Sequence, residues 1–388
     1  MPIAAAPPPA RQTSVMPSLK PPHGDRSTGA PVTQASSAFR PSPLPLQILI
    51  VRVSSLGDVV HNMPMLADLH RQYPQAQIDW VVEEGYTSLV RLNRGVRTVL
   101  PFALRRWRKA LLKPDQRAEA WAQMRAFGQA LRATRYDLVF DTQGLFKTGL
   151  VMRMARLAPG GRRIGLANAT EGSGYEAISR IFHTTSIAVG LRTHAVLRAR
   201  SVAGGALGYV VDGPADFGLQ APPLSAAGAT GPDWLPRQPY AVFFHGTARA
   251  AKQWAPAHWI EVGRLLAARG LPVLLPWGSA EERLAAQRLA RQIPDAVVLP
   301  HLPMMEAVLL AQRAALVIGL DSGLTHIAAA YGRPTVELYC DSPRWKTEGN
   351  WSPAIINLGD TGTPPTVGEV VAAIERLLGL RDGLPGTA

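Results

Sequence analysis

The sequence predicts an α/β protein with two doubly wound parallel sheets, and three observations support this fold class. Short runs of apolar, β-branched residues alternate with helical stretches, which is the βαβ rhythm of parallel sheets buried on both faces. The rhythm stops at residues 213–239, a linker rich in proline, glycine and alanine, and then restarts. The chain has 388 residues and 47% hydrophobic content, enough for two domains with separate cores.

The first domain is predicted over residues 47–212. Its opening run, 48–53, has the composition of a strand buried on both faces, and a loop and a helix over 59–73 follow it. Further elements are expected as strands at 78–82, 98–100 and 138–140 and as a helix at 116–133.

The second domain is predicted over residues 240–375. We expect strands at 240–244, 272–275, 296–299 and 315–319. Helices are expected between them, at 258–269, 281–292 and 305–314. Ligands of such sheets bind beyond the carboxyl ends of the strands, so we expect the site in a cleft between the two domains.

The two ends of the chain are expected to lie outside these domains. Residues 1–46 hold 11 of the 34 prolines, and we expect a disordered extension there and a flexible tail at 376–388. No run approaches the roughly 18 apolar residues that span a bilayer, and the N-terminus lacks the pattern of a secretory signal. We therefore expect a soluble, cytoplasmic protein whose basic surface touches the inner membrane.

Charge and cysteine content narrow the possible partners. The net charge of +13 favours anionic partners, namely nucleic acid, an acidic membrane surface or phosphorylated substrates. The single cysteine, Cys340, excludes an intramolecular disulfide and a cysteine-based metal cluster. We interpret Cys340 as a small buried residue after a strand.

The loop after the first strand has the small residues that allow a ligand to approach the backbone. Ser54, Ser55 and Gly57 lead into a predicted helix, and Asp58 stands at its start. Asp58 has two compatible interpretations, as a helix-capping carboxylate and as a general base.

Two loops of the second domain carry groups suited to a nucleotide. Thr247 and Lys252 suit phosphate oxygens, although a solvated loop has the same composition. Glu281 and Glu282 begin a helix, where they either accept hydrogen bonds from the ribose hydroxyls or complement the helix dipole.

A further loop, residues 321–326, follows a predicted strand and begins a helix. The backbone donors of Ser322 and Gly323 suit a diphosphate, and Asp321 either fixes the loop or contacts the ligand. We interpret His326 first as a hydrogen-bonded core histidine and second as a residue that orients the loop.

One segment concentrates positive charge around an aromatic residue. Arg105, Arg106, Arg108 and Lys109 surround Trp107. Such a cluster binds a phosphate or carboxylate, or forms a solvated face, while Trp107 stacks on a sugar or anchors a helix in the core. Nucleic acid is a weaker expectation because the sequence has no recognised nucleic-acid motif.

Taken together, the loops resemble one enzyme family. Residues 54–61, 141–147 and 321–326 are similar to the signatures of glycosyltransferase family 9, which contains the lipopolysaccharide heptosyltransferases. Residues 105–109, 246–254 and 276–278 resemble specifically the heptosyltransferase I type, which adds the first heptose. The resemblance covers about residues 47–375, and it departs at Ala248 and Cys340, where a hydroxyl residue and a glycine are usual.

The resemblance implies a fold and a reaction. The fold is GT-B, with two Rossmann-like domains facing across a cleft. The reaction moves heptose from ADP-L-glycero-β-D-manno-heptose to the Kdo of Kdo2-lipid A, with inversion and without a metal or other cofactor. The alternatives are a heptosyltransferase II type, which adds a later heptose, and a non-catalytic protein that binds nucleotides or nucleic acid. We expect a monomer and no nucleic-acid partner.

The resemblance also implies residue roles, carried over by position. Asp58 is the expected base. The expected donor-binding residues are Thr247, Lys252, Glu281, Glu282, Asp321, Ser322, Gly323, Leu324, Thr325 and His326. The expected acceptor-binding residues are Ser54, Ser55, Gly57, Arg105, Arg106, Trp107, Arg108, Lys109, Gln143 and Lys147.

Overall fold

A computed structural model of the chain describes residues 45–223, 232–247 and 249–382. The expected extension at 1–46 and the expected tail therefore lie largely outside the described residues, as do residues 224–231 of the expected linker and Ala248. Leu46, at the end of the expected extension, is buried in the core, so the packed fold begins at least one residue earlier than the sequence predicts.

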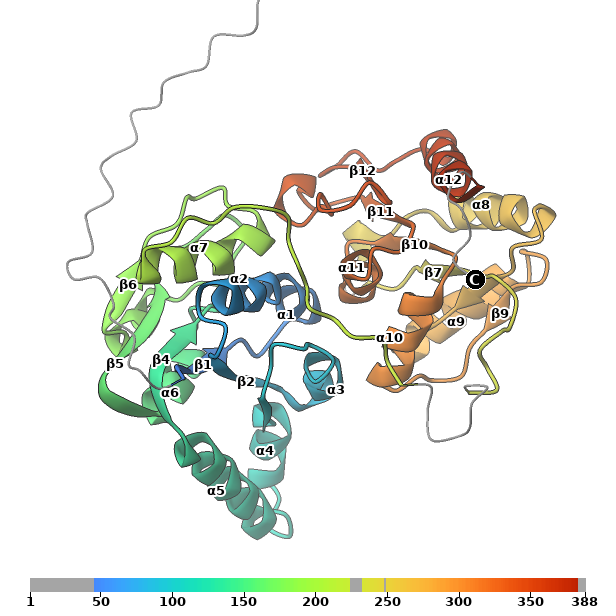
Figure 1. Ribbon diagram of the computed structural model, residues 1–388. Coiled ribbons are helices and arrows are strands. Elements are labelled where there is room, and N and C mark those ends of the chain that lie inside the picture. The colour runs from blue at the N-terminus through green and yellow to red at the C-terminus, as the bar shows by residue number, and fades with distance from the viewer. Residues whose placement is uncertain (1–44, 224–231, 248, 383–388) are drawn as a thin grey trace, which may run out of the picture. The chain divides into compact units, whose positions relative to one another are not determined.

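The first half of the described chain forms a six-stranded parallel sheet in the order β3-β2-β1-β4-β5-β6 (Figure 1). Its strands are β1 Gln47–Val51, β2 Gln77–Glu83, β3 Thr98–Phe102, β4 Arg135–Asp141, β5 Arg156–Leu166 and β6 Thr185–Ile187. Ile48 and Ile50 pack with one set of helices and Leu49 and Val51 with the other, so β1 is buried on both faces as predicted.

The second half forms another six-stranded parallel sheet, in the order β12-β11-β10-β7-β8-β9. Its strands are β7 Ala241–Phe244, β8 Val273–Leu275, β9 Val297–Val298, β10 Leu316–Leu320, β11 Thr335–Tyr339 and β12 Ile355–Gly359. The strand order repeats that of the first sheet, with the first strand of each half beside the fourth. Each sheet therefore has a topological switch point, between β1 and β4 and between β7 and β10, where ligands of such folds bind.

Helices cover the sheets (Figure 1). Those of the first half are α1 Leu56–Asn62, α2 Pro64–Gln72, α3 Thr87–Val90, α4 Leu104–Leu111, α5 Arg117–Ala133, α6 Phe146–Met154 and α7 Ala195–Leu207, with 3-10 turns η1 Glu84–Tyr86 and η2 Ala177–Phe182. Those of the second half are α8 Pro256–Ala268, α9 Ala280–Ala290, α10 Met304–Arg313, α11 Gly323–Ala330 and α12 Val367–Asp382, with turns η3 Ala250–Lys252 and η4 Arg344–Lys346.

Two predicted boundaries differ from the structure. The helix expected over residues 59–73 begins earlier, at Leu56, and is divided into α1 and α2, because Pro64 has no N–H to continue the first helix and starts the second. The last helix, α12, continues to Asp382, beyond the boundary predicted at residue 375.

The two halves share part of their core. One cluster of buried side chains includes Ile48 and Ile50 of β1 together with Val242 and Phe244 of β7. Helices α1 and α11 pack against each other, as do α3 and α10. The loops at the two switch points are consequently held close to each other.

Candidate active site

The carboxylate of Asp58 lies at the N-terminus of α1, directly beyond β1. Ser55 is the N-cap residue of this helix. One oxygen of Asp58, Oδ2, accepts hydrogen bonds from the Ser55 backbone N–H (3.3 Å) and from the Ser55 hydroxyl (2.9 Å). Asp58 thus closes a capping arrangement with one oxygen, which leaves the other oxygen free for a second set of partners.

Two arginines hold that second oxygen, Oδ1. The guanidinium of Arg52 lies 2.7 Å from it and that of Arg198 lies 3.3 Å from it. Arg52 is fixed in turn by the carbonyl oxygen of Thr142, 2.6 Å from Nη1, and Arg198 by the hydroxyl of Thr170 at 3.2 Å. Both arginine side chains are buried, so they are rigid neighbours of the carboxylate.

The charges around Asp58 keep it ionised. Burial by itself would raise its pKa, but the nearby positive charges of Arg52 and Arg198 outweigh burial and hold the pKa well below its usual range. The same environment lowers the pKa of Arg198 to about 10, chiefly because that guanidinium is buried beside the charge of Arg52. The result is a carboxylate with two arginine partners on one oxygen and a third of its side chain exposed.

Asp58 faces a cavity of about 180 Å³. Three of the predicted acceptor-binding residues also line it, namely Ser54, Ser55 and Gln143. Sequence reasoning missed its other lining residues, Arg52, Leu145, Gly172, Ser173, Gly174, Arg198 and Lys346. Gly57 and Lys147 are not among the lining residues of this cavity.

A buried aspartate positions Gln143. Asp141, at the end of β4, accepts hydrogen bonds from the backbone N–H groups of Gln143 (2.9 Å) and Gly144 (3.0 Å) and from the Thr148 hydroxyl (2.9 Å). Burial raises the pKa of Asp141 to about 6 in spite of these bonds. Gln143 then accepts a hydrogen bond from the N–H of Val53 at 3.0 Å, which fixes its side chain across the end of β1.

The second half carries a matching charged cluster at its own switch point. Asp321, directly after β10, binds the Lys252 ammonium at 2.5 Å, the His326 ring at 3.1 Å and the Thr347 hydroxyl at 3.1 Å. Burial would raise the pKa of Asp321, but the hydrogen bond and charge of His326 and the charge of Lys252 hold it well below its usual range. Lys252 and Asp321 thus form the ion pair that joins the loops after β7 and β10.

His326 is both a core histidine and the residue that fixes this loop. Its Nδ1 lies 3.1 Å from a carboxylate oxygen of Glu337, and Tyr339 donates a hydrogen bond to the other oxygen at 2.8 Å. Burial would lower the pKa of His326, but Glu337 and Asp321 raise it to about 10. The ring is therefore a buried imidazolium between two carboxylates.

The remaining residues of the loop at 321–326 face inward. The Thr325 hydroxyl donates to the carbonyl oxygen of Leu320 at 2.7 Å and lies 3.0 Å from the Ser322 hydroxyl. Leu324 packs against the shared core. These side chains shape the turn, which leaves backbone groups as its means of contact with a ligand.

The other predicted donor residues lie in the loop after β7 and in the first turn of α9, the helix that follows β8. Glu282 accepts the N–H of Gly278 at 2.7 Å and lies so close to Gly246 that a Cβ at Gly246 would be 2.5 Å from its carboxylate. Glu281 is exposed. The hydroxyl of Thr247 lies 3.5 Å from the N–H of Arg249, and the neighbouring Ala248 falls outside the described residues.

Two glycines allow α1 and α11 to meet. A Cβ at Gly323 would lie 2.5 Å from the Leu56 side chain, and one at Gly57 would lie 3.2 Å from the His326 ring. The His61 and His326 rings are 4.5 Å apart at the same contact. This close packing brings the N-terminus of α1, which carries Asp58, beside the N-terminus of α11, which follows Asp321.

The basic segment forms helix α4 and adjoins a separate hollow of about 580 Å³, whose lining includes Arg105, Arg106 and Lys109. Arg106 binds the Glu84 carboxylate at 2.9 Å. Arg108 is exposed and does not line this hollow. Lys147 and Arg105 both lie near the Glu83 carboxylate, whose pKa is raised by burial and lowered in part by these two cations.

Trp107 does not fit its predicted contact with an acceptor. Its side chain is only 4% exposed, it packs against Phe102 and Phe127, and its N–H donates to Gln123 at 3.1 Å. Trp107 anchors α4 in the core, which was the alternative interpretation of this residue.

Comparison with known proteins decides the family. The profile of glycosyltransferase family 9 (heptosyltransferase) matches residues 124–370. Lipopolysaccharide heptosyltransferase 1 of Pseudomonas aeruginosa is 39% identical over 297 residues, which is 76% of this chain and 78% of that protein. The chain belongs to glycosyltransferase family 9.

Relatives in family 9 differ in how similar they are to this chain. Lipopolysaccharide heptosyltransferase 2 of Escherichia coli K12 is 26% identical over 309 residues, 76% of this chain and 82% of that protein. The solved structure of E. coli heptosyltransferase WaaC with ADP is similar at a TM-score of 0.71 and 31% identity, covering 86% of this chain and all of that one. A second WaaC structure, with ADP-2-deoxy-2-fluoro heptose, has a TM-score of 0.66 at 30% identity over 87% of this chain and all of that one. The GT-B fold predicted from the sequence is confirmed.

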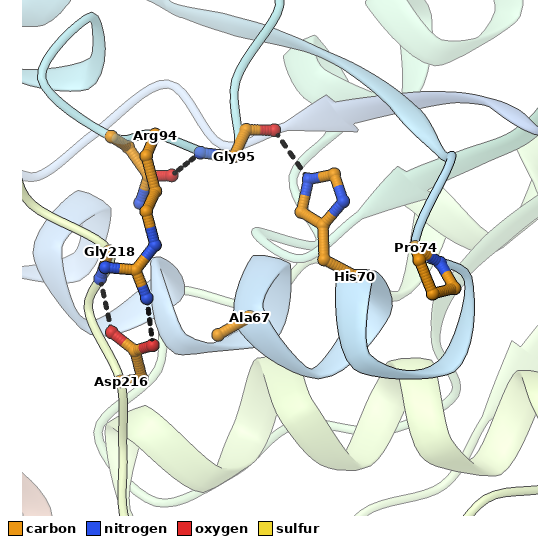
Figure 2. A pocket seen from close by; sticks show the side chains of 8 residues that line it. Ala67, His70, Pro74, Arg94, Gly95, Asp216 and Gly218 are labelled. Carbon is orange, nitrogen blue, oxygen red and sulfur yellow. Dashed lines mark hydrogen bonds and ion pairs between the residues drawn. The ribbon is translucent and has the colours of Figure 1, made fainter.

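Another hollow of this family 9 protein, of about 440 Å³, is structural (Figure 2). His70 bonds the carbonyl oxygen of Gly95 at 3.0 Å, and Arg94 pairs with Asp216. The polar groups drawn in Figure 2 bind one another, and these contacts join the loop after α3 to the segment around residue 216.

Two further predictions concern Cys340 and membrane spans. Cys340 is 6% exposed, and burial raises the pKa of its thiol to about 11, in agreement with a packing role. Within the described residues, none of the helices combines the length and apolar character needed to cross a bilayer.

Proposed function

We propose that this protein transfers heptose from ADP-L-glycero-β-D-manno-heptose to the Kdo residue of Kdo2-lipid A, with inversion at the anomeric carbon. The observation that carries the proposal is the position of Asp58. An ionised carboxylate lines a cavity, and the loop that carries it packs against the loop of the Lys252–Asp321 pair. An inverting displacement needs such a pair of sites, with a base on the acceptor side and positive charge on the side of the leaving group.

Asp58 is the proposed general base. Its Oδ2 takes the proton of the acceptor hydroxyl as that oxygen attacks the anomeric carbon, while the arginines hold the carboxylate in place through Oδ1. Gln143 and the serines of the same cavity offer hydrogen bonds that orient the acceptor sugar. The Ser55 hydroxyl donates a hydrogen bond to Oδ2 at 2.9 Å, so this bond has to break when Oδ2 takes the proton of the acceptor hydroxyl.

Lys252 is the proposed partner of the departing diphosphate. A diphosphate leaving group requires charge neutralisation but no general acid, and a lysine with backbone donors at the start of α11 supplies it. Thr247 extends this phosphate site, and Glu282 is the better placed of the two glutamates to meet the ribose, because it lies against Gly246 at the end of β7. On this proposal the reaction proceeds without a metal ion, and activity persists in excess EDTA.

The proposed acceptor is the unheptosylated Kdo2-lipid A. Lipopolysaccharide heptosyltransferase 1 of Pseudomonas aeruginosa is more similar to this chain than lipopolysaccharide heptosyltransferase 2 of Escherichia coli, at 39% against 26% identity. Membership of family 9 also makes a non-catalytic role, or one in nucleic-acid binding, the weaker alternative.

We further propose that the protein acts as a monomer at the cytoplasmic face of the inner membrane. Helix α4 presents Arg105, Arg108 and Lys109 as exposed cations. Opposite charges attract such a surface to an anionic lipid layer, and each cation contributes about 1 kcal/mol near the surface.

A transfer assay with defined substrates tests the proposed function. Purified protein is given ADP-heptose with either Kdo2-lipid A or its monoheptosylated form, and product is identified by mass. We expect turnover with Kdo2-lipid A and little with the heptosylated acceptor. The reverse preference would assign the second heptose, and no transfer to either acceptor would reject the proposal.

A further inference from the structure

Lys346 is a residue of the second half of the chain that lines the cavity of Asp58. It ends η4, and its Nζ donates a hydrogen bond to the carbonyl oxygen of Gly172, in the first half, at 2.5 Å. The loop that carries Lys346 is held on both sides. Thr347 donates to Asp321 at 3.1 Å, and the ring of His194 lies 3.0 Å from the carbonyl oxygen of Glu348. Lys346 is therefore placed by the donor-side cluster and by the first half together.

The charges that line the cavity do not balance. Its charged lining residues are Arg52, Arg198, Lys346 and Asp58. The two arginines share Asp58, whereas Nζ of Lys346 donates its hydrogen bond to a neutral carbonyl oxygen. Lys346 is half-buried, and this burial lowers the pKa of its ammonium. An excess of positive charge in a small cavity favours an anionic ligand.

The loop opposite Lys346 leaves it room. Gly172 has φ of +65°, and a Cβ at this position would lie 2.8 Å from Nζ. Ser173 and Gly174 continue the lining with small side chains. A carboxylate fits this space between Lys346 and Arg198, because both offer N–H donors and neither is enclosed by a bulky neighbour in that loop.

We propose that Lys346, together with Arg198, binds the carboxylate of the acceptor sugar. This inference rests on the function proposed above, and it adds that the nucleotide-binding half supplies a cation to the acceptor site. On binding, Nζ exchanges the Gly172 carbonyl for a carboxylate oxygen, and Arg198 divides its donors between that carboxylate and Asp58. Asp58 then loses part of the positive field that suppresses its basicity, so the acceptor's own charge strengthens the base.

The test compares Lys346→Met with Lys346→Arg and with the control Arg344→Met. Arg344 lies in the same turn and pairs with Glu348 at 3.2 Å, outside the lining of the cavity. For Lys346→Met we expect the KM of Kdo2-lipid A to rise at least tenfold, while the Kd of ADP, measured by calorimetry, stays within twofold of wild type. Arginine should restore most of the loss, and Arg344→Met should leave both constants near wild type.

An altered acceptor identifies the group that Lys346 binds. The carboxylate of the accepting Kdo is converted to a carboxamide, and both proteins are assayed with both acceptors as a double-mutant cycle. For wild type, we expect the amide to raise the KM of the acceptor about as much as Lys346→Met raises the KM of Kdo2-lipid A. Combining the two changes should raise the KM little further. Additive losses, or a loss of ADP affinity in Lys346→Met, would overturn the inference.

The proposed function and this inference fail in different ways. If wild type transfers no heptose, the proposed function fails, and the carboxylate site is then tested by direct titration of Kdo and its carboxamide into wild type and Lys346→Met. The site is supported if wild type binds Kdo at least tenfold more tightly than Lys346→Met does and shows no such advantage for the carboxamide. Equal binding of Kdo by the two proteins rejects it.

Discussion

The two halves of the molecule place an aspartate at the same point of the same topology and give it opposite electrostatics. Asp141 is the last residue of β4 and Asp321 directly follows β10, each at the switch point of its sheet. Asp141 receives hydrogen bonds from backbone and a hydroxyl, and its pKa is raised by burial to about 6. Asp321 receives a lysine and a histidine, and its pKa is lowered.

The difference teaches where charge is needed. Asp141 holds a loop and can do so with little charge, because its partners are neutral. In the first half the charged carboxylate is instead Asp58, the third residue of α1 and seven residues after the end of β1, with two arginines around it. A carboxylate surrounded by cations at a switch point is thus the better marker of chemistry than a buried carboxylate in the corresponding turn.

The largest expected effect separates Asp58 from Asp141. Asp58→Asn should lower kcat by at least about a thousandfold, since general-base catalysis contributes typically 10²–10⁴-fold and the arginines also lose their counter-charge. Asp141→Asn should retain more than a tenth of wild-type activity, because an amide oxygen still accepts the two N–H groups. Steady-state transfer rates decide this, with ADP affinity as the control for folding. Equal losses in the two variants would contradict the division of roles.

The next effect concerns Asp321. Asp321→Asn should raise the KM of ADP-heptose about ten- to a hundredfold, because Lys252 loses the carboxylate that fixes its ammonium and His326 loses one of its two partners. Charge-assisted bonds of this kind contribute roughly 1.5–3 kcal/mol each. Calorimetry with ADP measures the loss directly. Donor affinity unchanged from wild type would show that the pair is a structural contact only.

A smaller effect is expected from the contact between the halves. Gly323→Ala places a methyl group 2.5 Å from the Leu56 side chain, which forces α1 away from α11 and separates the two charged clusters. We expect roughly a tenfold fall in kcat, on the order of 1.4 kcal/mol in the barrier. The double variant Leu56→Ala with Gly323→Ala relieves the overlap and should recover part of the loss. No recovery would place the cause within the donor loop itself.

The last prediction concerns stability instead of activity. Asp141 has a folded pKa of about 6, above its unfolded value, so its contribution to stability is fully present below the unfolded value and is lost as pH rises through 6. Relative to wild type, Asp141→Asn should therefore gain about 1–3 kcal/mol in the free energy of unfolding between pH 4 and pH 7. Urea unfolding across this range measures the change. Asp58→Asn is the control, because Asp58 stays ionised throughout and its difference from wild type should be constant.

The sequence was sufficient for the ranges of β1–β4 and β7–β10 and for the loops that carry the predicted site, whereas no ranges were predicted for β5, β6, β11 and β12. Runs such as residues 48–53 are β-branched and apolar because both faces of the sheet are covered, and that constraint is visible locally. The break at Pro64 was equally visible but went unused in the prediction of a single helix over 59–73. Asp58 was found because its loop has a local pattern.

Other site residues could not be found from local patterns. Arg198 lies 140 residues from Asp58, within a helix that has no motif, and Lys346 lies in the other half of the chain. Only the fold brings them to one cavity. The one available signal was Arg52, a lone cation at the end of an apolar strand, since a charge in that position requires a nearby partner. Trp107 shows the opposite case, in which an aromatic residue among cations is buried and packs in the core against Phe102 and Phe127.

The shared core limits how readily one half of the chain can be replaced by the corresponding half of a relative. The side chains of β1 and β7 belong to one buried cluster, so each half completes part of its interior with side chains of the other, although each also has a cluster of its own. In a recombinant that joined the second half of this chain to the first half of a distant relative, the shared cluster would contain side chains from two different proteins. Changes in the loops that line the Asp58 cavity leave that cluster intact, so we expect the fold to tolerate them better than an exchange of whole halves.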